Sequence, residues 1–335
     1  MVVTERTARE GARVRGGHPW RGSAFGLALE APHPLPTIGA NGARAGRRTV
    51  VELVAPPVLD RAWPGREAES VVDRRFPDGA AMLRIDRHPE AGFRIWGPGY
   101  GRYVVSPAGR RIQAALPRRT WRWQRLFFAQ VLPLAAALQG LETFHASAVA
   151  LSGRAVAFVA SAGTGKTSLA AHLVAAGAPL ITDDVLALEP TSRGVIAHPG
   201  CGLVNLDESE LVAMEEVGRQ RMGRFLGRSD KLHFAAPVFA RELPLGLVYF
   251  LRRTGSEGPL AIVEDRRSTQ RLLAAGFLAY LRSPQRLVNH LEACAKVREV
   301  APTFDVKVPV GLPARALAAE VRTHATAVLG PEGGP

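Results

Sequence analysis

One short stretch of the chain carries residue types that could bind phosphate groups. Residues 160–168 read Ala-Ser-Ala-Gly-Thr-Gly-Lys-Thr-Ser, which matches the pattern G-x-x-x-x-G-K-[ST] except for an alanine at the first glycine. Gly163 and Gly165 would let the backbone turn its N–H groups inward around phosphate oxygens. Lys166 would place a positive charge near the β- and γ-phosphates, and Thr167 would offer a hydroxyl to Mg²⁺. The stretch predicts a loop that binds the phosphates of a nucleotide.

The segments on either side of this stretch have the patterns that such a loop requires. Residues 155–159 form a short apolar run that is typical of a buried strand. After Lys166, apolar and alanine residues recur at helical spacing, and Gly177 is expected to end the helix. A strand, a glycine loop and a helix in this order distinguish the motif from a chance glycine turn.

Two adjacent carboxylates follow the next predicted strand. Residues 178–182 read as a short strand that ends in Asp183-Asp184. Phosphoryl transfer needs one carboxylate to hold Mg²⁺ and often another to accept the proton of an attacking hydroxyl. Adjacent side chains on a strand point to opposite faces, so we expect the two to take different roles or one to leave the strand. Without the preceding loop, the pair would be interpreted as a solvated turn.

Two other features carry polar groups without an assigned chemistry. His145 lies in an apolar run, residues 144–150, and a lone histidine in such a run is most often a buried residue with a satisfied hydrogen bond. Arg252-Arg253 follow a predicted strand at 245–251. A basic pair at that place either stabilises charge at a phosphate site or is simply solvated.

The order of these parts resembles a known family. His145, a hairpin into the glycine loop, a helix, a glycine and a strand ending in Asp183-Asp184 are similar to the catalytic domain of HPr kinase/phosphorylase. That family contains serine kinases with a P-loop fold related to phosphoenolpyruvate carboxykinase. More closely, the chain resembles HPr-kinase-related proteins encoded beside peptide natural-product genes, some of which phosphorylate a serine of a precursor peptide, including lasso-peptide precursors. The detailed match covers residues 141–206.

The resemblance implies a role for each matching residue, with ATP and Mg²⁺ as the bound species. Asp183 would be the general base, with His145 beside it, and Lys166 would act on the transferred phosphate. Thr167 and Asp184 would bind the metal. The residues expected to hold the triphosphate are Ser161, Ala162, Gly163, Thr164, Gly165, Lys166, Thr167 and Ser168.

The chain departs from the family pattern at three positions. Ser168 stands where the family often has an acidic residue after the loop hydroxyl. Residues 198–206 are similar to the family's glycine-containing signature strand, but the usual Glu and Arg fall on Ala197 and Pro199. Because a second metal-binding carboxylate is missing, we expect kinase activity without the reverse phosphorylase activity.

Composition sets the broad limits. The 335 residues are enough for two domains, and a hydrophobic content of 47% supports a packed core. Two cysteines are too few for a disulfide framework, and no signal peptide is visible, so a cytoplasmic location is expected. The apolar stretch 126–141 is short and interrupted, which favours a buried helix over a membrane span. A net charge of +13 would attract acidic partners, but no nucleic-acid-binding module is recognisable.

The predicted fold class is α/β, with a β-rich N-terminal domain at 23–118 and a P-loop domain of the HPr kinase type at 119–330. Basic residues 1–22 and the end, 331–335, are expected to be disordered tails. Strands are predicted, in an antiparallel sheet, at 23–30, 49–54, 69–76, 81–87, 93–96 and 100–105. Further predictions are a helix at 119–139 ended by Gly140, a partly helical region to Arg228, and helices at 268–281, 284–300 and 314–329.

These observations lead to one expected function and two alternatives. The expected function is transfer of the γ-phosphate of ATP to a Ser or Thr hydroxyl of a peptide, plausibly a lasso-type precursor peptide. The first alternative is a kinase for a small-molecule hydroxyl, such as a free amino acid or a sugar. The second is a nucleotide-binding module that recognises a peptide without catalysis. The expected partner is the peptide substrate, with neither a specific nucleic acid nor a membrane, and a homo-oligomer is left open.

Overall fold

The computed structural model describes residues 19–39, 46–117, 120–255, 258–281 and 283–330. Within these residues the chain is a mixed α/β protein with two eight-stranded sheets and one three-stranded sheet. The C-terminal tail predicted at 331–335 lies outside the described residues, as do residues 1–18 of the N-terminal one. The remainder of the predicted N-terminal tail is structured, because strand β1 begins at Trp20.

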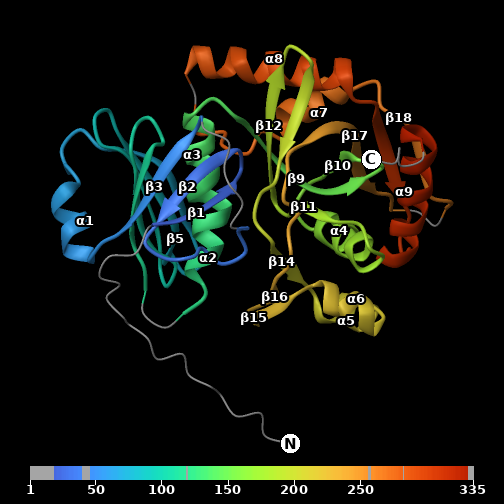
Figure 1. The fold of residues 1–335 in the computed structure, drawn as a ribbon, viewed down its shortest axis with the longest axis horizontal. Helices are drawn as coiled ribbons and strands as arrows, with labels where there is room; N and C mark the ends of the chain where they lie inside the picture. The colour runs from blue at the N-terminus through green and yellow to red at the C-terminus, as the bar shows by residue number, and fades with distance from the viewer. Residues whose placement is uncertain (1–18, 40–45, 118–119, 256–257, 282, 331–335) are drawn as a thin grey trace, which may run out of the picture.

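The first eight-stranded sheet is formed by the N-terminal third of the chain (Figure 1). Its order is β1-β2-β3-β8-β7-β6-β5-β4, and β3 pairs in parallel with both β2 and β8. The predicted antiparallel sheet is therefore a mixed one. The strands are Trp20–Ala24 (β1), Leu27–Ala31 (β2), Arg48–Leu53 (β3), Glu69–Arg75 (β4), Ala81–His88 (β5), Gly92–Gly97 (β6), Gly101–Val105 (β7) and Arg111–Ala115 (β8). Helix α1 (Pro56–Ala62) and strand β8 were not predicted.

The single strand predicted at 23–30 is wrong, because a hairpin turn divides it. Phe25 and Gly26 connect β1 to β2 with φ angles of 53° and 73°. Positive φ at both central residues is what a tight two-residue hairpin turn requires. Phe25 is fully buried, and its N–H donates to the Pro199 carbonyl at 2.7 Å, so packing and a hydrogen bond offset the unfavourable backbone angle.

The helix predicted at 119–139 is present in three consecutive parts. Helices α2 (Trp123–Leu126) and α3 (Leu132–Leu138) flank a π-helical segment, η1 (Phe127–Val131). Gly140 follows with a φ of 91°, and the helix ends before it as predicted. The π-helical hydrogen bonding was not visible in the sequence; such segments occur often at functional sites.

One apolar core joins this helical segment to the N-terminal sheet and to the second half of the chain. It contains buried side chains of the sheet, most of those on η1 and α3, and Val185, Ala187, Cys201 and Leu203. The two halves thus share a core across the domain boundary predicted at 118, and the boundary itself stays a prediction. No helix among the described residues is long and apolar enough to cross a membrane.

The second large sheet carries the glycine loop. Its order is β10-β9-β12-β13-β17-β19-β18, with β11 paired to β9, and β10 also pairs in parallel with β17. Five strands therefore close into a ring of pairings. The strands are Glu142–Leu151 (β9), Arg154–Val159 (β10), Leu180–Thr182 (β11), Val185–Thr191 (β12), Gly194–His198 (β13), Leu243–Arg253 (β17), Ala261–Glu264 (β18) and Thr303–Val308 (β19).

Helices cover both faces of this sheet. Val156 and Phe158 of β10 pack with α4 (Lys166–Ala175) and α9 (Ala314–Leu329) in one apolar cluster. Ala157 and Val159, the alternate residues, face a second cluster that includes side chains of α7 (Ser268–Ala274) and α8 (Pro284–Val300). Figure 1 shows α4 and α9 near each other and α7 and α8 on the opposite side.

Two segments differ from prediction near the loop. The helix predicted at 268–281 stops at Ala274, and the following chain runs beside β9, where the Phe277 N–H donates to the Thr143 carbonyl at 2.9 Å. The region expected to be partly helical to Arg228 contains α5 (Glu208–Val212) and α6 (Glu216–Arg221), but its last residues form a strand.

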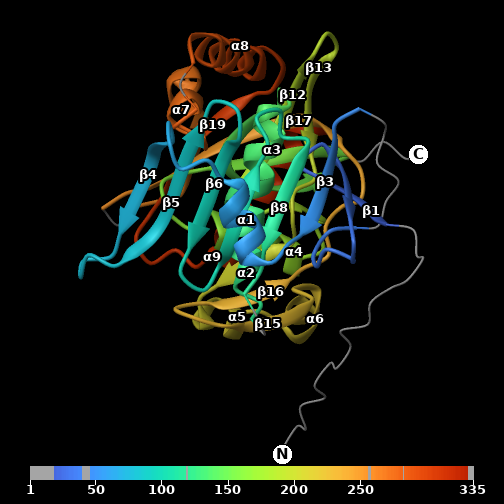
Figure 2. The same cartoon turned by 90° about the vertical axis from the view of Figure 1, so that its left-hand side faces the viewer.

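That strand belongs to a small sheet of three strands. The sheet has the order β14-β16-β15, from Leu203–Leu206 (β14), Leu232–Ala235 (β16) and Arg224–Arg228 (β15). In Figure 2 it lies with α5 and α6 beyond one end of the N-terminal sheet, while α7 and α8 lie beyond the other end.

Candidate functional site

The glycine loop connects β10 directly to α4. Gly163 and Gly165 have φ angles of 78° and 107°, which side chains with a Cβ atom rarely adopt. A Cβ atom at Gly163 would meet nothing within 4 Å, so its backbone stands open for another group to approach. The predicted strand, loop and helix are therefore all present, and the loop ends at the N-terminus of α4.

Lys166 folds back over this loop. Its Nζ donates to the Ala160 carbonyl at 2.6 Å and lies 3.1 Å from Nε2 of His145. Burial lowers the pKa of Lys166, whereas Asp184 and, less strongly, Asp183 raise it. Because both direct contacts of this cation are neutral, its charge is available to an anionic ligand.

His145 connects Lys166 to the second aspartate. Its Nδ1 lies 3.2 Å from Oδ1 of Asp184 and 3.1 Å from the Asp184 carbonyl oxygen. Because both of these are acceptors, Nδ1 carries the proton and Nε2 accepts from Lys166. His145 is thus a hydrogen-bonded link within a polar cluster, not a buried residue of the core.

Asp183 is buried against the first turn of α4. Its Oδ1 accepts hydrogen bonds from the Ser147 hydroxyl at 2.6 Å and the Thr167 hydroxyl at 3.0 Å. The other oxygen, Oδ2, is buried without a partner among the described residues. Burial raises the pKa of Asp183 to about 6. Ser147 was missed by sequence reasoning, although its spacing of two from His145 places both on one face of β9.

Asp184 lies in the open part of the same turn. The strand β11 ends at Thr182, and Asp184 has a φ of 71°, so both aspartates follow the strand rather than end it. The Asp184 side chain is 41% exposed, whereas the Asp183 side chain is buried. The two carboxylates thus occupy different environments, as expected for two different roles.

A large cavity, called here the loop cavity, opens beside the glycine loop. It has a volume of about 880 Å³, and its walls include Ser161, Ala162, Thr164, His145 and Asp184. Of the residues predicted to hold the triphosphate, the other five do not line it: Gly163, Gly165, Lys166, Thr167 and Ser168.

Arginines from separate elements also line the loop cavity. Arg253 donates to the Thr164 carbonyl at 3.3 Å, so one member of the basic pair contacts the loop. Arg252 and Arg271 both pair with Asp305. Arg74, on the edge strand β4 of the N-terminal sheet, was not singled out from the sequence. The basic wall could accept the charge of phosphate groups.

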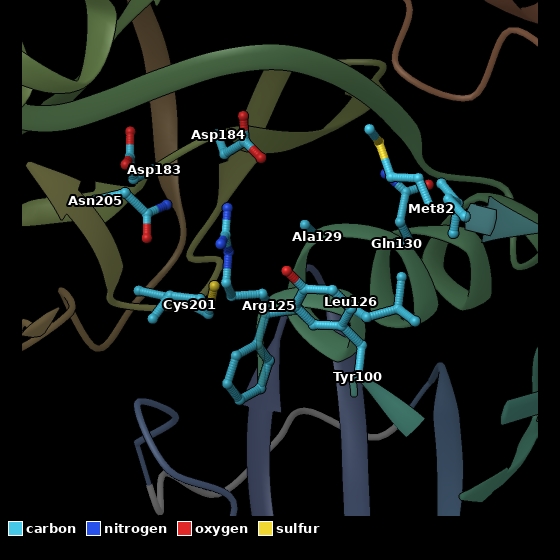
Figure 3. A pocket seen from close by; sticks show the side chains of 13 residues that line it. Met82, Tyr100, Arg125, Leu126, Ala129, Gln130, Asp183, Asp184, Cys201 and Asn205 are labelled. Atoms are coloured by element: carbon cyan, nitrogen blue, oxygen red, sulfur yellow. The ribbon is translucent and has the colours of Figure 1, made fainter. Parts of the chain in front are cut away.

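A second cavity, called here the apolar cavity, lies beside the acidic pair (Figure 3). It has a volume of about 230 Å³, and its walls combine Asp183 and Asp184 with side chains from β5, α2, η1 and β14. Asp184 and Gln130 line both cavities, so the two spaces meet there. Gln130 comes from the π-helical segment, and sequence reasoning missed it.

The residues present fit a magnesium ion. Mg²⁺ is held in kinases by one or two carboxylates, a hydroxyl and substrate phosphates rather than by a complete protein cage. The unpartnered Oδ2 of Asp183 and the Thr167 hydroxyl, which donates to the other oxygen of the same carboxylate, form such a donor set. No three His, Cys, Asp or Glu side chains in the described part of the chain form a metal cage.

Comparison with known proteins adds little to this geometry. No family model matches the chain, and no curated protein matches it in sequence. Among solved structures, the Hpr(Ser) kinase/phosphatase from Coxiella burnetii is similar over 56% of this chain and 99% of its own, with 14% identity and a TM-score of 0.32. A TM-score this low carries no argument. The likeness to HPr kinases is therefore still a resemblance in sequence motifs, and the function proposed below is argued from the geometry of the site.

Proposed function

We propose that this protein is a kinase that transfers the γ-phosphate of ATP to a hydroxyl group. The observation that carries the proposal is the hydrogen bond between Thr167 of the glycine loop and the buried Asp183. It joins the two motifs that were recognised separately in the sequence. Lys166 and Asp184 are connected to the same cluster through His145.

The loop would bind the triphosphate through its backbone N–H groups and the N-terminus of α4. Lys166 would exchange the Ala160 carbonyl for the β- and γ-phosphate oxygens, and their charge would offset the cost of its burial more directly than the two aspartates do. Arg253, already held at the loop by Thr164, would add positive charge at its rim.

Metal binding is assigned to Thr167 and Asp183. A bound Mg²⁺ would neutralise charge on the β- and γ-phosphates. This division differs from the roles implied by the family resemblance, which gave the metal to Asp184 and the base function to Asp183. Oδ2 of Asp183 is buried and has no hydrogen-bond partner among the described residues, which favours metal binding by Asp183 and leaves the base function to Asp184.

Asp184 would act as the general base. Its exposed carboxylate would accept the proton of the acceptor hydroxyl while that oxygen attacks the γ-phosphorus in line. The bond between the γ-phosphorus and the bridging oxygen breaks, and ADP leaves with that electron pair. His145 orients the carboxylate through Nδ1. Most of the catalysis would come from positioning and charge, because this reaction asks little else of the protein.

The acceptor expected from the family resemblance is a Ser or Thr hydroxyl of a peptide, and we retain that hydroxyl chemistry in the proposal. A small-molecule hydroxyl is favoured by one observation, the modest volume of the apolar cavity next to Asp184.

The proposal is tested with ATP labelled on its γ-phosphate, Mg²⁺ and the purified protein, by following label to water or to an added hydroxyl compound. Asp184→Asn should lower the rate about 10²- to 10⁴-fold, as expected for loss of a general base. Asp78→Asn, an exposed carboxylate that lines neither cavity, is the matched control. Undiminished turnover in Asp184→Asn would refute the base assignment. Nucleotide binding without any transfer would favour the recognition-module alternative.

A further inference from the structure

The apolar cavity has the position required of an acceptor site. It meets the loop cavity at Asp184 and Gln130, so a hydroxyl placed against Asp184 from one side faces a phosphate placed from the other. We propose that it binds the acceptor, and that it selects a compound of about the size of one amino acid that carries an anionic group near its hydroxyl. This inference rests on the proposed function, because Asp184 is its common point.

The volume of the cavity limits the size of what enters. Pockets for drug-sized ligands usually start at about 300 Å³. The cavity therefore accepts one compact group, either a free small molecule or one residue of a peptide, and does not accommodate a folded surface.

One wall of the cavity is apolar. It is formed by Met82 and Leu83 of the N-terminal sheet, Leu126 and Phe128 of the helical segment, and Leu203 of β14. These side chains would exclude water from an enclosed acceptor and strengthen electrostatic contacts at the polar end. The wall also gives the N-terminal sheet a part in the reaction, which its sequence did not indicate.

The polar end of the cavity presents a cation, Arg125, that makes no direct ion pair with a described carboxylate. It contacts the Ser229 hydroxyl at 3.4 Å, and through this hydroxyl it lies near Asp230, whose pKa it helps to lower. The centre of the Tyr100 ring lies 6.0 Å away. In Figure 3 its guanidinium points toward the two aspartates. A half-buried guanidinium with free donors is a good partner for a carboxylate or another oxyanion.

Asn205 provides a second donor whose orientation is fixed. Its Oδ1 accepts from Nδ1 of the fully buried His233 at 2.5 Å, and Nε2 of that ring lies 2.7 Å from the Ser229 hydroxyl, which donates to Asp230. Trp121 packs over the ring at 4.4 Å between centres. Burial lowers the pKa of His233 to about 4, so the ring stays neutral near pH 7. With its oxygen engaged, Asn205 offers its NH₂ group to the cavity.

Two donors, Arg125 and Asn205, and one base, Asp184, thus surround a small apolar space. A neutral compound that lacks the anion would leave the hydrogen-bond donors of Arg125 and Asn205 unpaired, so it should be rejected. The anion and the hydroxyl must be close together, because both groups have to fit in a cavity of about 230 Å³.

The test compares acids with their neutral amides. Glycerate and N-acetyl-L-serine, with the corresponding amides, serve as small-molecule probes for transfer from labelled ATP. A blocked pentapeptide with a central serine beside Asp, and its Asn twin, tests the peptide source of the same chemistry. We expect at least one acid to be preferred to its neutral twin by about tenfold or more in kcat/KM. A preference among the small molecules identifies a free metabolite as the acceptor, and a preference among the pentapeptides identifies a peptide.

Variants connect the preference to the cavity. Arg125→Met should reduce the preference to less than about threefold, chiefly by raising KM for the acid, while Arg125→Lys keeps part of it. Arg122→Met, an exposed arginine at the start of the same helix that does not line the cavity, should keep the full preference.

Three results would overturn the inference: equal use of acids and amides, a preference that survives in Arg125→Met, or no transfer to any acid by wild-type protein that still hydrolyses ATP. In all three the proposed kinase site would stand. A wild-type protein that neither binds nor hydrolyses Mg²⁺–ATP would instead refute the proposed function itself.

Discussion

The two cavities that meet at Asp184 are built in opposite ways. The loop cavity takes one wall from nearly consecutive residues, 159–162 and Thr164, and its contacts with a ligand would be mostly backbone N–H groups and cations. The apolar cavity takes its walls from four distant parts of the chain, 82–83, 100, 125–130 and 201–205, together with the acidic pair. Its contacts with a ligand would be side chains.

This contrast reflects what each side would have to recognise. A triphosphate is the same in every ATP-dependent reaction, so a short loop with fixed backbone geometry is sufficient to bind it. An acceptor differs between enzymes, so its site depends on side chains that the fold brings together. Changes on the two sides of Asp184 should therefore affect different ligands, and the following predictions test that separation.

The largest effect is expected at Lys166. Lys166→Ala should weaken binding of Mg²⁺–ATP and lower transfer by about 10²- to 10³-fold, because the cation that would contact the β- and γ-phosphates is lost. Equilibrium binding of labelled ADP and ATP measures it. Lys231→Ala is the control, since Lys231 is exposed and pairs with Asp207 at 3.5 Å. Unchanged nucleotide affinity in Lys166→Ala would argue against a phosphate-binding loop.

The two aspartates should separate in their dependence on Mg²⁺. Asp183→Asn should raise the Mg²⁺ concentration needed for half-maximal turnover about tenfold or more, because a carboxylate is replaced by a neutral ligand. Asp184→Asn should lower the maximal rate with little change in that concentration. Turnover titrated with Mg²⁺ at fixed ATP distinguishes the two. The reverse pattern would restore the roles implied by the family resemblance.

A matched pair of small-to-large substitutions tests the two cavities directly. Ala129→Leu fills part of the apolar cavity and should raise KM for the acceptor by about tenfold while leaving ADP affinity unchanged. Ala162→Leu narrows the loop cavity and should weaken ADP binding instead. If both substitutions affected the same ligand, the division between a donor side and an acceptor side would be wrong.

The smallest effect concerns stability. Burial raises the pKa of Asp183 to about 6, above the value of about 3.9 of an unfolded chain, so the folded protein binds the proton more tightly. Stability from this group is present below pH 4 and is lost as the pH rises through 6. Without Mg²⁺, Asp183→Asn should therefore stabilise the fold at pH 8 by about 3 kcal/mol and have little effect at pH 4. Urea unfolding at both pH values measures it, and an equal effect at both would contradict the account.

The residues on the nucleotide side of the site, in the glycine loop and the acidic pair, could be predicted because they are close together in the sequence. The glycine spacing, the predicted helix after Lys166 and the strand before Asp183-Asp184 are local signals, and each is present in the structure. The sequence could not divide the work between the two aspartates. That division depends on a hydroxyl from Thr167 and on burial, which result from the packing of α4 against β9 and β11.

The residues that line the apolar cavity could not be predicted, because they are far apart in the sequence and only the fold brings them together. Arg125 and Gln130 belong to a helix whose apolar pattern indicates only burial, and its π-helical segment has no separate sequence signal. Asn205 reaches the cavity only through the pairing of β14 with β16, where His233 holds it. The turn at Phe25-Gly26 was hidden because tertiary packing, not local preference, holds Phe25 at a positive φ.

The most direct test of the central claim is a crystal structure with Mg²⁺ and an ATP analogue whose β–γ bridge cannot be cleaved. The account predicts the triphosphate within loop 160–165, Lys166 Nζ moved from the Ala160 carbonyl to the phosphates, and the γ-phosphate facing Asp184 at the junction of the two cavities. A nucleotide bound elsewhere, or a γ-phosphate directed away from Asp184, would contradict it.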